Sequence, residues 1–286
     1  MSGVGVTLRE WALTGIPVGG WVEDAVNYLE AHFAHAFDAF SNVLLAIHGV
    51  ISAVLGGAPP WAVIAGFALL AWAIAGRGVF VFTLLGLLLT LNIGMWPSFV
   101  ATLALVLLAE LVVVIIGLPL GVLAGVSRPV ARVLTPILDF MQTMPPFVYL
   151  IPAVTFFGLG VVPGVVATVI FSVPPLIRLT NFGLRQVPGD LIEAADAFGS
   201  NRWQKLTKVQ LPVAAPTIMA GVNQSIMLNL SMVVIAALIG AEGLGGDVIR
   251  GMNTLNIGLG FEAGLAIVVM AIVLDRITQG AGGRRR

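Results

Sequence analysis

The chain has 286 residues, of which 58% are hydrophobic and 10% carry a formal charge, whereas an ordinary soluble domain carries about 25% charged residues. This composition excludes an ordinary soluble domain and predicts an all-α polytopic membrane protein. The formal net charge of +0 does not indicate a nucleic-acid partner, and the absence of cysteine excludes disulfides, thiolate metal sites and cysteine nucleophiles.

Residues 1–58 are expected to form an extracytoplasmic or interfacial region. The first 15 residues have no apolar core, so we expect no signal peptide and insertion through internal spans. Apolar residues then recur at helical spacing, which predicts an amphipathic helix on the membrane surface. These residues are Val22, Ala25, Val26, Leu29, Phe33, Phe37 and Phe40. The apolar continuation of this helix, residues 43–55, is shorter than the roughly 20 residues that a span needs.

Three residues of this helix have the spacing of metal ligands: His32, His35 and Asp38. The pattern lacks a fourth ligand, and the three residues lie between the apolar positions. A solvated polar face therefore explains them better than a metal site, and no metal is predicted.

Seven apolar segments follow, and each is predicted to cross the membrane. They cover residues 61–76, 79–96, 99–125, 144–161, 163–181, 214–239 and 258–275. The first two lie in a unit spanning 59–98, and the other five lie in 99–280 together with a polar loop at 190–212. Residues 281–286 are predicted to be a cytoplasmic tail.

The basic residues predict the orientation, because cytoplasmic loops carry an excess of Lys and Arg. With the N-terminus outside, only Arg9 and Arg250 fall on the outer face. The other 12 of the 14 basic residues fall on the inner face: Arg77, Arg128, Arg132, Arg178, Arg185, Arg202, Lys205, Lys208, Arg276, Arg284, Arg285 and Arg286. An odd number of spans then places the C-terminus in the cytoplasm.

The third predicted span carries one acid and a row of glycines. Glu110 lies in its middle, where an acid is costly and usually faces a cavity or a partner. Glu110 is either a gate or proton site, or a hydrogen-bonded packing residue. Gly117, Gly121 and Gly125 are four residues apart, a spacing that lets two helix backbones approach closely, either within one subunit or between subunits.

The sixth predicted span is the most polar. Its polar side chains either line a translocation path or form interhelical hydrogen bonds: Asn223, Gln224, Ser225, Asn229 and Ser231. The six tryptophans are scattered, so no aromatic cage for a quaternary ammonium group is visible. The glycine-rich loop at 240–247 follows on the outer side, as a gate, a contact for another protein or a plain connector.

The polar loop at 190–212 predicts two short helices meeting at a glycine. Asp190 is expected to cap a first helix that begins at Leu191, with Glu193 completing a capping box. Leu191, Ala194, Ala195 and Phe198 share one face of that helix, and Gly199 is expected to end it with a positive φ. Asn201 and Gln204 predict a second capped helix to about residue 209, closed by Leu211 and Pro212. A rigid hairpin of this kind is typical of a docking element.

The spacing of Glu193-Ala194-Ala195, Gly199 and Leu211-Pro212 resembles the EAA loop of ABC-importer membrane subunits. Residues 139–152, 171–180 and 208–240 resemble, more narrowly, the permease subunits of glycine betaine/proline betaine importers. The resemblance implies the type I ABC importer permease fold, with an ABC transmembrane type-1 core over 99–280. It also implies a bacterial or archaeal cytoplasmic membrane.

The resemblance implies a division of labour between subunits. Two copies of the permease pair with two cytoplasmic ATPase subunits, which carry ATP and Mg, and an extracytoplasmic binding protein delivers the substrate. The chain contains no G-x-x-x-x-G-K-[ST] sequence, so it has no P-loop and is not expected to be an enzyme or to hold a cofactor.

Three alternatives stay open. The same architecture would serve choline, carnitine or another compatible solute. An ion-coupled secondary transporter would need several paired intramembrane charges and inverted repeats, and the sequence suggests neither. A membrane scaffold without transport is disfavoured by the polar sixth span.

Overall fold

A computed structural model describes residues 17–283, which form helices and contain no strand. The helices are α2 (Val18–Gly57), α3 (Pro60–Ala75), α4 (Arg77–Asn92), α5 (Trp96–Val126), α6 (Arg128–Thr143), α7 (Pro146–Phe157), α8 (Val161–Arg185), α9 (Gly189–Ala197), α10 (Arg202–Lys205), the π-helix η1 (Leu206–Gln210), α11 (Leu211–Ala237), α12 (Leu244–Asn253) and α13 (Ile257–Gly283). Arg9 and the three C-terminal arginines lie outside the described residues.

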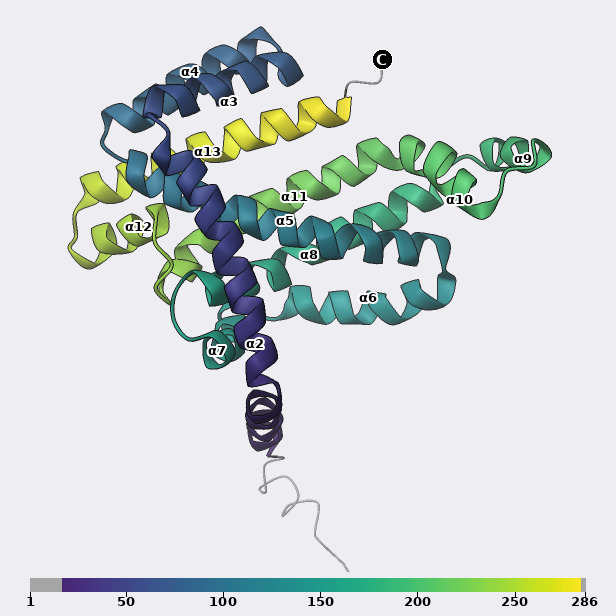
Figure 1. Ribbon diagram of the computed structural model, residues 1–286, viewed down its shortest axis with the longest axis horizontal. Coiled ribbons are helices and arrows are strands. Elements are labelled where there is room, and N and C mark those ends of the chain that lie inside the picture. The colour runs from purple at the N-terminus through teal and green to yellow at the C-terminus, as the bar shows by residue number, and fades with distance from the viewer. Residues whose placement is uncertain (1–16, 284–286) are drawn as a thin grey trace, which may run out of the picture.

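The centre of the molecule is a bundle of α5, α8 and α11, which run side by side in Figure 1. Small residues bring these helices together. A Cβ at Gly221 of α11 would lie 3.2 Å from the Cα of Leu176 on α8. Apolar side chains such as Leu108 and Val113 of α5 are fully buried in the same core. Van der Waals packing, which needs such close approach, is therefore what holds these helices together.

A second layer consists of α13 and the antiparallel hairpin of α3 and α4 (Figure 1). A Cβ on Gly86 of α4 would lie 2.8 Å from a methyl group of Val269 on α13. Gly280, near the end of α13, packs against the backbone carbonyl of Ile74. The end of α3 therefore lies beside the C-terminal end of α13. The helices α3 and α4 correspond to the first two predicted spans and have 16 residues each.

The fourth predicted span, residues 144–161, forms only the 12-residue helix α7, and the helix before it, α6, was not predicted. α6 and α7 meet at an angle of 98° at residues 144–145. Met144 and Pro145 are extended, with ψ of 136° at each, because a residue before proline is driven out of the helical region. Two prolines in succession therefore end α6 and start α7. The hydroxyl of Tyr149 donates to the carbonyl of Met141 across the bend.

The N-terminal region differs from the expected short surface helix. α2 is a single helix of 40 residues and is long and apolar enough to cross a membrane. Figure 1 shows it running across the central bundle rather than along it. Its C-terminal half packs on the molecule through Leu44, and Phe37 stacks on Phe156 with ring centroids 4.6 Å apart. The half before Phe37 is largely exposed.

The number of candidate spans also differs from the predicted seven. By length and composition, five helical segments of the described chain qualify: α2, α5, α8, the continuous segment Arg202–Ala237 and α13. Six qualify if the bent pair α6–α7 counts as one span. The difference arises because α3 and α4 are short and α2 is long.

Candidate functional site

The loop at 190–212 projects from one end of the bundle, as α9 and α10 in Figure 1. α9 begins at Gly189 after the extended Pro188, and no side chain caps it. The predicted cap by Asp190 is therefore wrong. Pro188 starts the helix two residues earlier than expected, which places Asp190 in the first turn, where its negative charge interacts favourably with the helix dipole.

The predicted turn at Gly199 is confirmed. Its φ is +74°, and its N–H donates to the carbonyl of Asp196 at 2.9 Å. The N–H of Ser200 donates to the carbonyl of Ala195 at 3.0 Å. These two bonds form a Schellman motif, which satisfies carbonyl groups that the end of α9 would leave without partners.

The second predicted cap is also confirmed. The side chain of Asn201 accepts from the N–H of Gln204 at 2.8 Å, and the Gln204 side chain accepts from the N–H of Asn201 at 2.9 Å. An ion pair of 2.6 Å between Lys205 and Asp196 joins the two arms of the hairpin. The hairpin is therefore fixed by a cap on each side of the turn and by one cross-link.

The hairpin does not end at Leu211 and Pro212. α10 continues through the π-helix η1 into α11, so residues 202–237 form one continuous helix. Pro212 has no N–H and cannot make the regular helical bond to the carbonyl of Lys208. The helix widens to the π form at this place, which is common at functional sites. The hairpin is therefore joined without a break to a helix that is long and apolar enough to cross a membrane.

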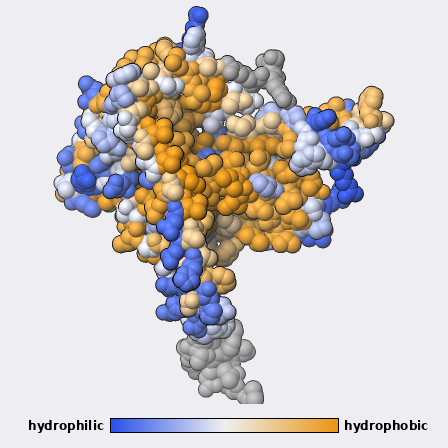
Figure 2. Space-filling view, in the orientation of Figure 1, coloured by the Kyte–Doolittle hydropathy of each residue, from blue (hydrophilic) through white to orange (hydrophobic). Residues whose placement is uncertain are grey.

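Large apolar side chains are exposed on the hairpin. Phe198 is 91% exposed and Trp203 is 70% exposed. Glu193 and Ala194 are exposed as well, whereas Ala195 is buried. Figure 2 shows hydrophilic residues gathered at this end, whereas the surface of the bundle is mostly hydrophobic.

The glycine row of α5 faces α8 within the same chain. A Cβ at Gly121 would lie 2.5 Å from the Cβ of Thr180, and one at Gly125 would lie 2.6 Å from Leu184. Gly117 meets Leu176 in the same way, at 3.0 Å. The structure therefore assigns this row to packing inside one subunit.

Glu110 is buried between α5 and α11. One carboxylate oxygen accepts from the hydroxyl of Ser225 at 2.7 Å, and the other accepts from the side-chain amide of Asn229 at 2.8 Å. Asn229 is fully buried, and its own amide oxygen has no partner among the described residues. Glu110 thus holds α5 against α11 through hydrogen bonds.

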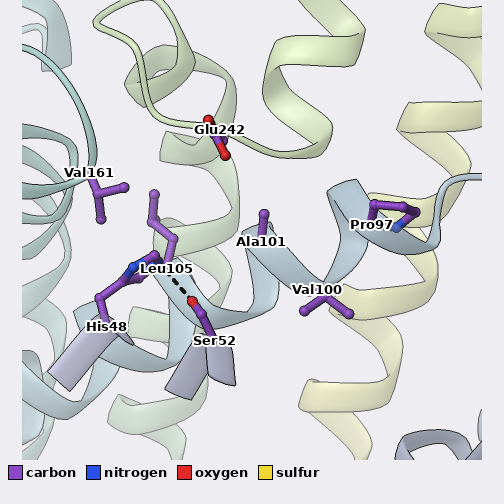
Figure 3. A pocket seen from close by; sticks show the side chains of 8 residues that line it. All are labelled: His48, Ser52, Pro97, Val100, Ala101, Leu105, Val161 and Glu242. Atoms are coloured by element: carbon purple, nitrogen blue, oxygen red, sulfur yellow. Dashed lines mark hydrogen bonds between the residues drawn. The ribbon is translucent and has the colours of Figure 1, made fainter. Parts of the chain in front are cut away.

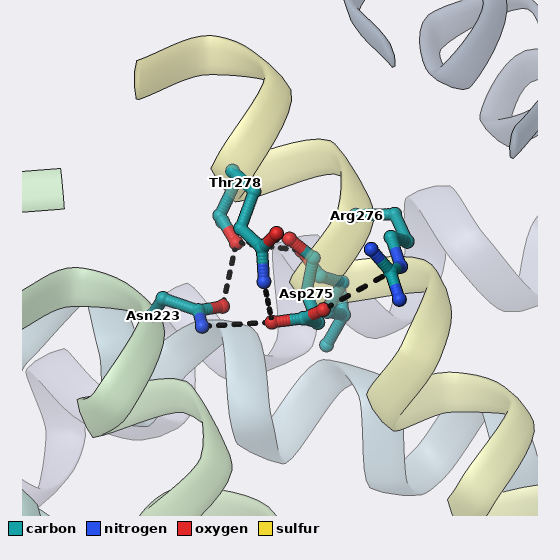
Figure 4. A network of polar contacts seen from close by, with 6 residues as sticks. Asn223, Asp275, Arg276 and Thr278 are labelled. Carbon is teal, nitrogen blue, oxygen red and sulfur yellow. Dashed lines mark hydrogen bonds and ion pairs between the residues drawn. The ribbon is translucent and has the colours of Figure 1, made fainter. Parts of the chain in front are cut away.

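The other polar residues of α11 face in two directions. Asn223 donates to Asp275 of α13 at 2.7 Å and accepts from the hydroxyl of Thr278 at 2.9 Å (Figure 4). Gln224 and Ser231 are exposed on the surface of the chain. Of the five residues predicted to line a path, only these last two therefore have the exposure that a path needs.

The glycine-rich loop at 240–247 is anchored to α5. The N–H of Leu244 donates to the hydroxyl of Thr102 at 2.8 Å, and Gly243 has a φ of +123°. A cavity of about 300 Å³ lies beside this loop, with His48 and Ser52 of α2 facing Glu242 across it (Figure 3). Residues 240–247 are thus a fixed turn next to α2 and not a loose connector.

Residues 117–281, more than half of the chain, match the family described as "Binding-protein-dependent transport system inner membrane component". The chain belongs to this family. It is an ABC importer permease with the type I fold, and its place is a bacterial inner membrane. Family membership implies an ATPase and a binding protein as partners of this permease.

Individual relatives match nearly the whole chain. The permease is 52% identical over 268 residues to the glycine betaine transport system permease protein OpuAB of Bacillus subtilis, covering 93% of this chain and 95% of that protein. It is 50% identical over 270 residues to the glycine betaine/proline betaine transport system permease protein ProW of Escherichia coli, covering 94% and 76%. Among solved structures, an inward-facing methionine ABC transporter, MetNI, superposes with a TM-score of 0.56 at 25% identity, covering 66% of this chain and 93% of that chain.

Sequence reasoning missed an ion pair in this permease. Arg178 of α8 donates to the carboxylate of Asp139 on α6 at 2.5 Å. Arg178 lies inside the predicted fifth span, 163–181, and the sequence pattern alone predicts only an inner-face charge for it. An arginine inside a predicted span itself indicates a functional residue, because charged side chains are rare in membrane spans and usually have a functional role.

Proposed function

We propose that this permease imports glycine betaine or a related small molecule with a methylated nitrogen. The observation that carries the proposal is the identity of about half, over nearly the whole chain, to permeases named for glycine betaine. Other relatives are named for glycine betaine/carnitine, at 49% identity, and for trimethylamine N-oxide, at 43%. These compounds share a methylated nitrogen that carries a formal positive charge, so that group defines the substrate class.

We infer that residues 190–212 dock on a cytoplasmic ATPase subunit, which binds ATP and Mg, and that this chain holds no cofactor. The exposed Phe198 and Trp203 support the proposal, because large exposed apolar side chains on a rigid hairpin are typical of protein interfaces. The unbroken helix from Arg202 to Ala237 supports a direct mechanical link from that interface into the membrane.

We infer that two copies of the permease enclose the translocation path between them. Gln224 and Ser231 support this arrangement, since exposed polar side chains on a membrane helix are unfavourable against lipid. The two residues are seven positions apart on α11 and therefore share one face. That face points away from the chain's own bundle and is available to a water-filled path.

We infer an external N-terminus and a cytoplasmic C-terminus. Although α2 is long enough to span and α3 and α4 have only 16 residues each, α2 runs across the bundle whereas α3 and α4 run along it (Figure 1). We therefore place α2 on the outer surface and count α3, α4, α5, the α6–α7 pair, α8, α11 and α13 as one crossing each, which keeps the number odd. The contact of Gly280 with Ile74 supports this, because it brings Arg77 to the same end as the tail of α13. Basic residues then gather on the inner side.

Reconstitution tests the proposed function. The permease is placed in vesicles with its ATPase subunits and binding protein, and uptake of labelled glycine betaine, carnitine and choline is measured with and without internal ATP. We expect ATP-dependent uptake, with glycine betaine preferred. Uptake that follows an ion gradient without ATP would contradict the mechanism, and preferred uptake of choline would change the substrate.

A further inference from the structure

We propose that the Arg178–Asp139 pair is a transient binding site for the substrate in the translocation path, with Arg178 taking the carboxylate of a zwitterion and Asp139 taking its methylated ammonium group. The inference rests on the proposed function and assigns residues to it. The pair joins α6 to α8, the helix of the central bundle next to which α6 lies (Figure 1).

The exposure of the pair is the first argument. The side chain of Arg178 is 40% exposed and that of Asp139 is 56% exposed on the surface of the single chain. Arg178 lies seven residues before the end of α8, about 10 Å along the helix axis. Two charged side chains at this depth are costly against hydrocarbon. They must therefore face water or a second copy of the chain, and the proposed translocation path lies between two such copies.

The hydrogen-bonding capacity of Arg178 is the second argument. One of its terminal nitrogens, Nη2, contacts Asp139, whereas its Nε is buried and has no partner among the described residues. A guanidinium group has five N–H donors in a planar fork that matches a carboxylate. Because a buried donor without a partner is costly, the guanidinium gains from a rearrangement that gives Nε an acceptor, and the exposed part of the side chain is where a carboxylate can approach it.

The surroundings of Asp139 are the third argument. Phe140 follows it in the sequence and is 63% exposed, and Phe182 lies one turn beyond Arg178 on α8 and is 52% exposed. Methylated ammonium groups are held by a carboxylate charge together with aromatic faces. A cation and an anion side by side, with aromatic side chains nearby, offer both charges of a zwitterion a partner. The substrate would exchange each half of the ion pair for one of its own groups.

The pair is also suited to a substrate that passes through the site rather than one that is held tightly there. An empty path leaves Arg178 and Asp139 bonded to each other, so neither charge is without a partner before substrate arrives or after it leaves. Opening the pair costs the energy of a partly exposed ion pair, which is small. Binding at the site is then weak and reversible, as a path requires.

The test uses the complex of the permease with its ATPase subunits, in nanodiscs, without the binding protein. Binding of glycine betaine is followed by saturation-transfer NMR of its methyl protons. Nanodiscs of phosphatidylglycerol alone are compared with nanodiscs that contain phosphatidylethanolamine, whose headgroup also carries one anionic and one cationic group. We expect glycine betaine to saturate its site in both membranes. A signal that is lost when phosphatidylethanolamine is present would assign the pair to a lipid and overturn the proposal.

Two variants and a control separate binding from structure. Asp139→Asn and Arg178→Gln should each abolish the glycine betaine signal and lower the rate of uptake at least tenfold, with the concentration for half-maximal uptake unchanged, because the binding protein sets it. The control Asp275→Asn should keep the signal, because Asp275 is bonded inside the chain. The binding-protein-stimulated ATPase rate should persist in both path variants.

Other outcomes would overturn the proposal. Normal uptake in both variants would show that the pair only fastens α6 to α8. Loss of the permease dimer in either variant would make the pair a subunit contact. The proposed function stands in each of these cases if the wild-type complex imports glycine betaine, so the two failures are distinguishable.

Discussion

Substitution of Gly199 isolates the effect of backbone strain in the docking hairpin. Its φ is +74°, and a Cβ built at this position meets no atom within 4 Å. A side chain there therefore costs backbone strain without a steric clash. For an L-residue this strain is about 1–2 kcal/mol, and it is smaller for Asn, which tolerates the left-handed region. We expect the hairpin to be most stable with Gly at position 199, less stable with Asn, less again with Ala and least stable with Val.

The strain has a measurable local consequence. The amides of Gly199 and Ser200 are held by the Schellman bonds, so hydrogen exchange at these two amides reports the opening of the turn. A cost of about 1–2 kcal/mol corresponds to roughly 5- to 30-fold faster exchange in Gly199→Val. The membrane helices should keep their protection, and the permease should still insert. Co-purification of the ATPase subunit and the amount of substrate imported per ATP should both fall.

Gly189 provides the matched control. It lies in the same hairpin and also has open space around a built Cβ, but its φ is not positive. Gly189→Ala should therefore leave exchange at Gly199 and Ser200 unchanged and keep coupling intact. If Gly199→Val exchanges no faster than this control, the strain argument is wrong. If it exchanges faster but couples ATP hydrolysis normally, the hairpin is not the docking element.

Four further predictions follow from the contacts. Glu110→Gln should change the melting temperature and the rate of uptake only slightly. Glu110→Leu should lower the free energy of unfolding by about 1–3 kcal/mol for each polar group that it leaves without a partner. Loss of uptake in the Gln variant with an unchanged melting temperature would instead make Glu110 a gate. Gly121→Ala should destabilise by about 1–3 kcal/mol through overpacking against α8, measured by thermal unfolding beside Gly264→Ala, where a Cβ meets no atom within 4 Å. Asn223→Asp should weaken the contact between α11 and α13, because it places two carboxylates together. Adding Asp275→Asn should restore the contact, because the swapped pair again has an amide donor and a carboxylate acceptor for the 2.7 Å bond. Equal melting temperatures for the single and the double variant would refute this prediction. Reporter fusions should place the N-terminus outside and the C-terminus in the cytoplasm, and finding both on one side would refute the odd number of crossings.

Features with a short-range cause were predictable from the sequence. Gly199 and the Asn201–Gln204 capping box depend on residues within three or four positions of each other, and both formed as expected. The prediction that Asp190 caps the helix was wrong, because the nearby Pro188 sets the start of the helix at Gly189. The long apolar runs of α5, α8, α11 and α13 were also predicted, since length and hydropathy decide them.

Features that depend on contacts between distant segments were not predictable. The sequence gives Arg178 and Asp139 no reason to meet, because they are 39 positions apart and belong to different helices. Asn223 and Asp275 are 52 positions apart. A break at Met144 and Pro145 could be predicted, since consecutive prolines interrupt a helix, but its angle of 98° could not.

The contacts of α11 explain how one hairpin can act on the whole permease. Its N-terminal end continues into the docking hairpin, so a displacement there moves the helix as a rod. Glu110 fastens its middle to α5, and Asn223 fastens it to α13, which in turn carries the α3–α4 hairpin. Its only polar, exposed face is the one with Gln224 and Ser231. If the hairpin docks on an ATPase subunit as proposed, a movement that starts there would change the surface that carries Gln224 and Ser231 while the packed helices follow together, which is the arrangement that alternating access requires.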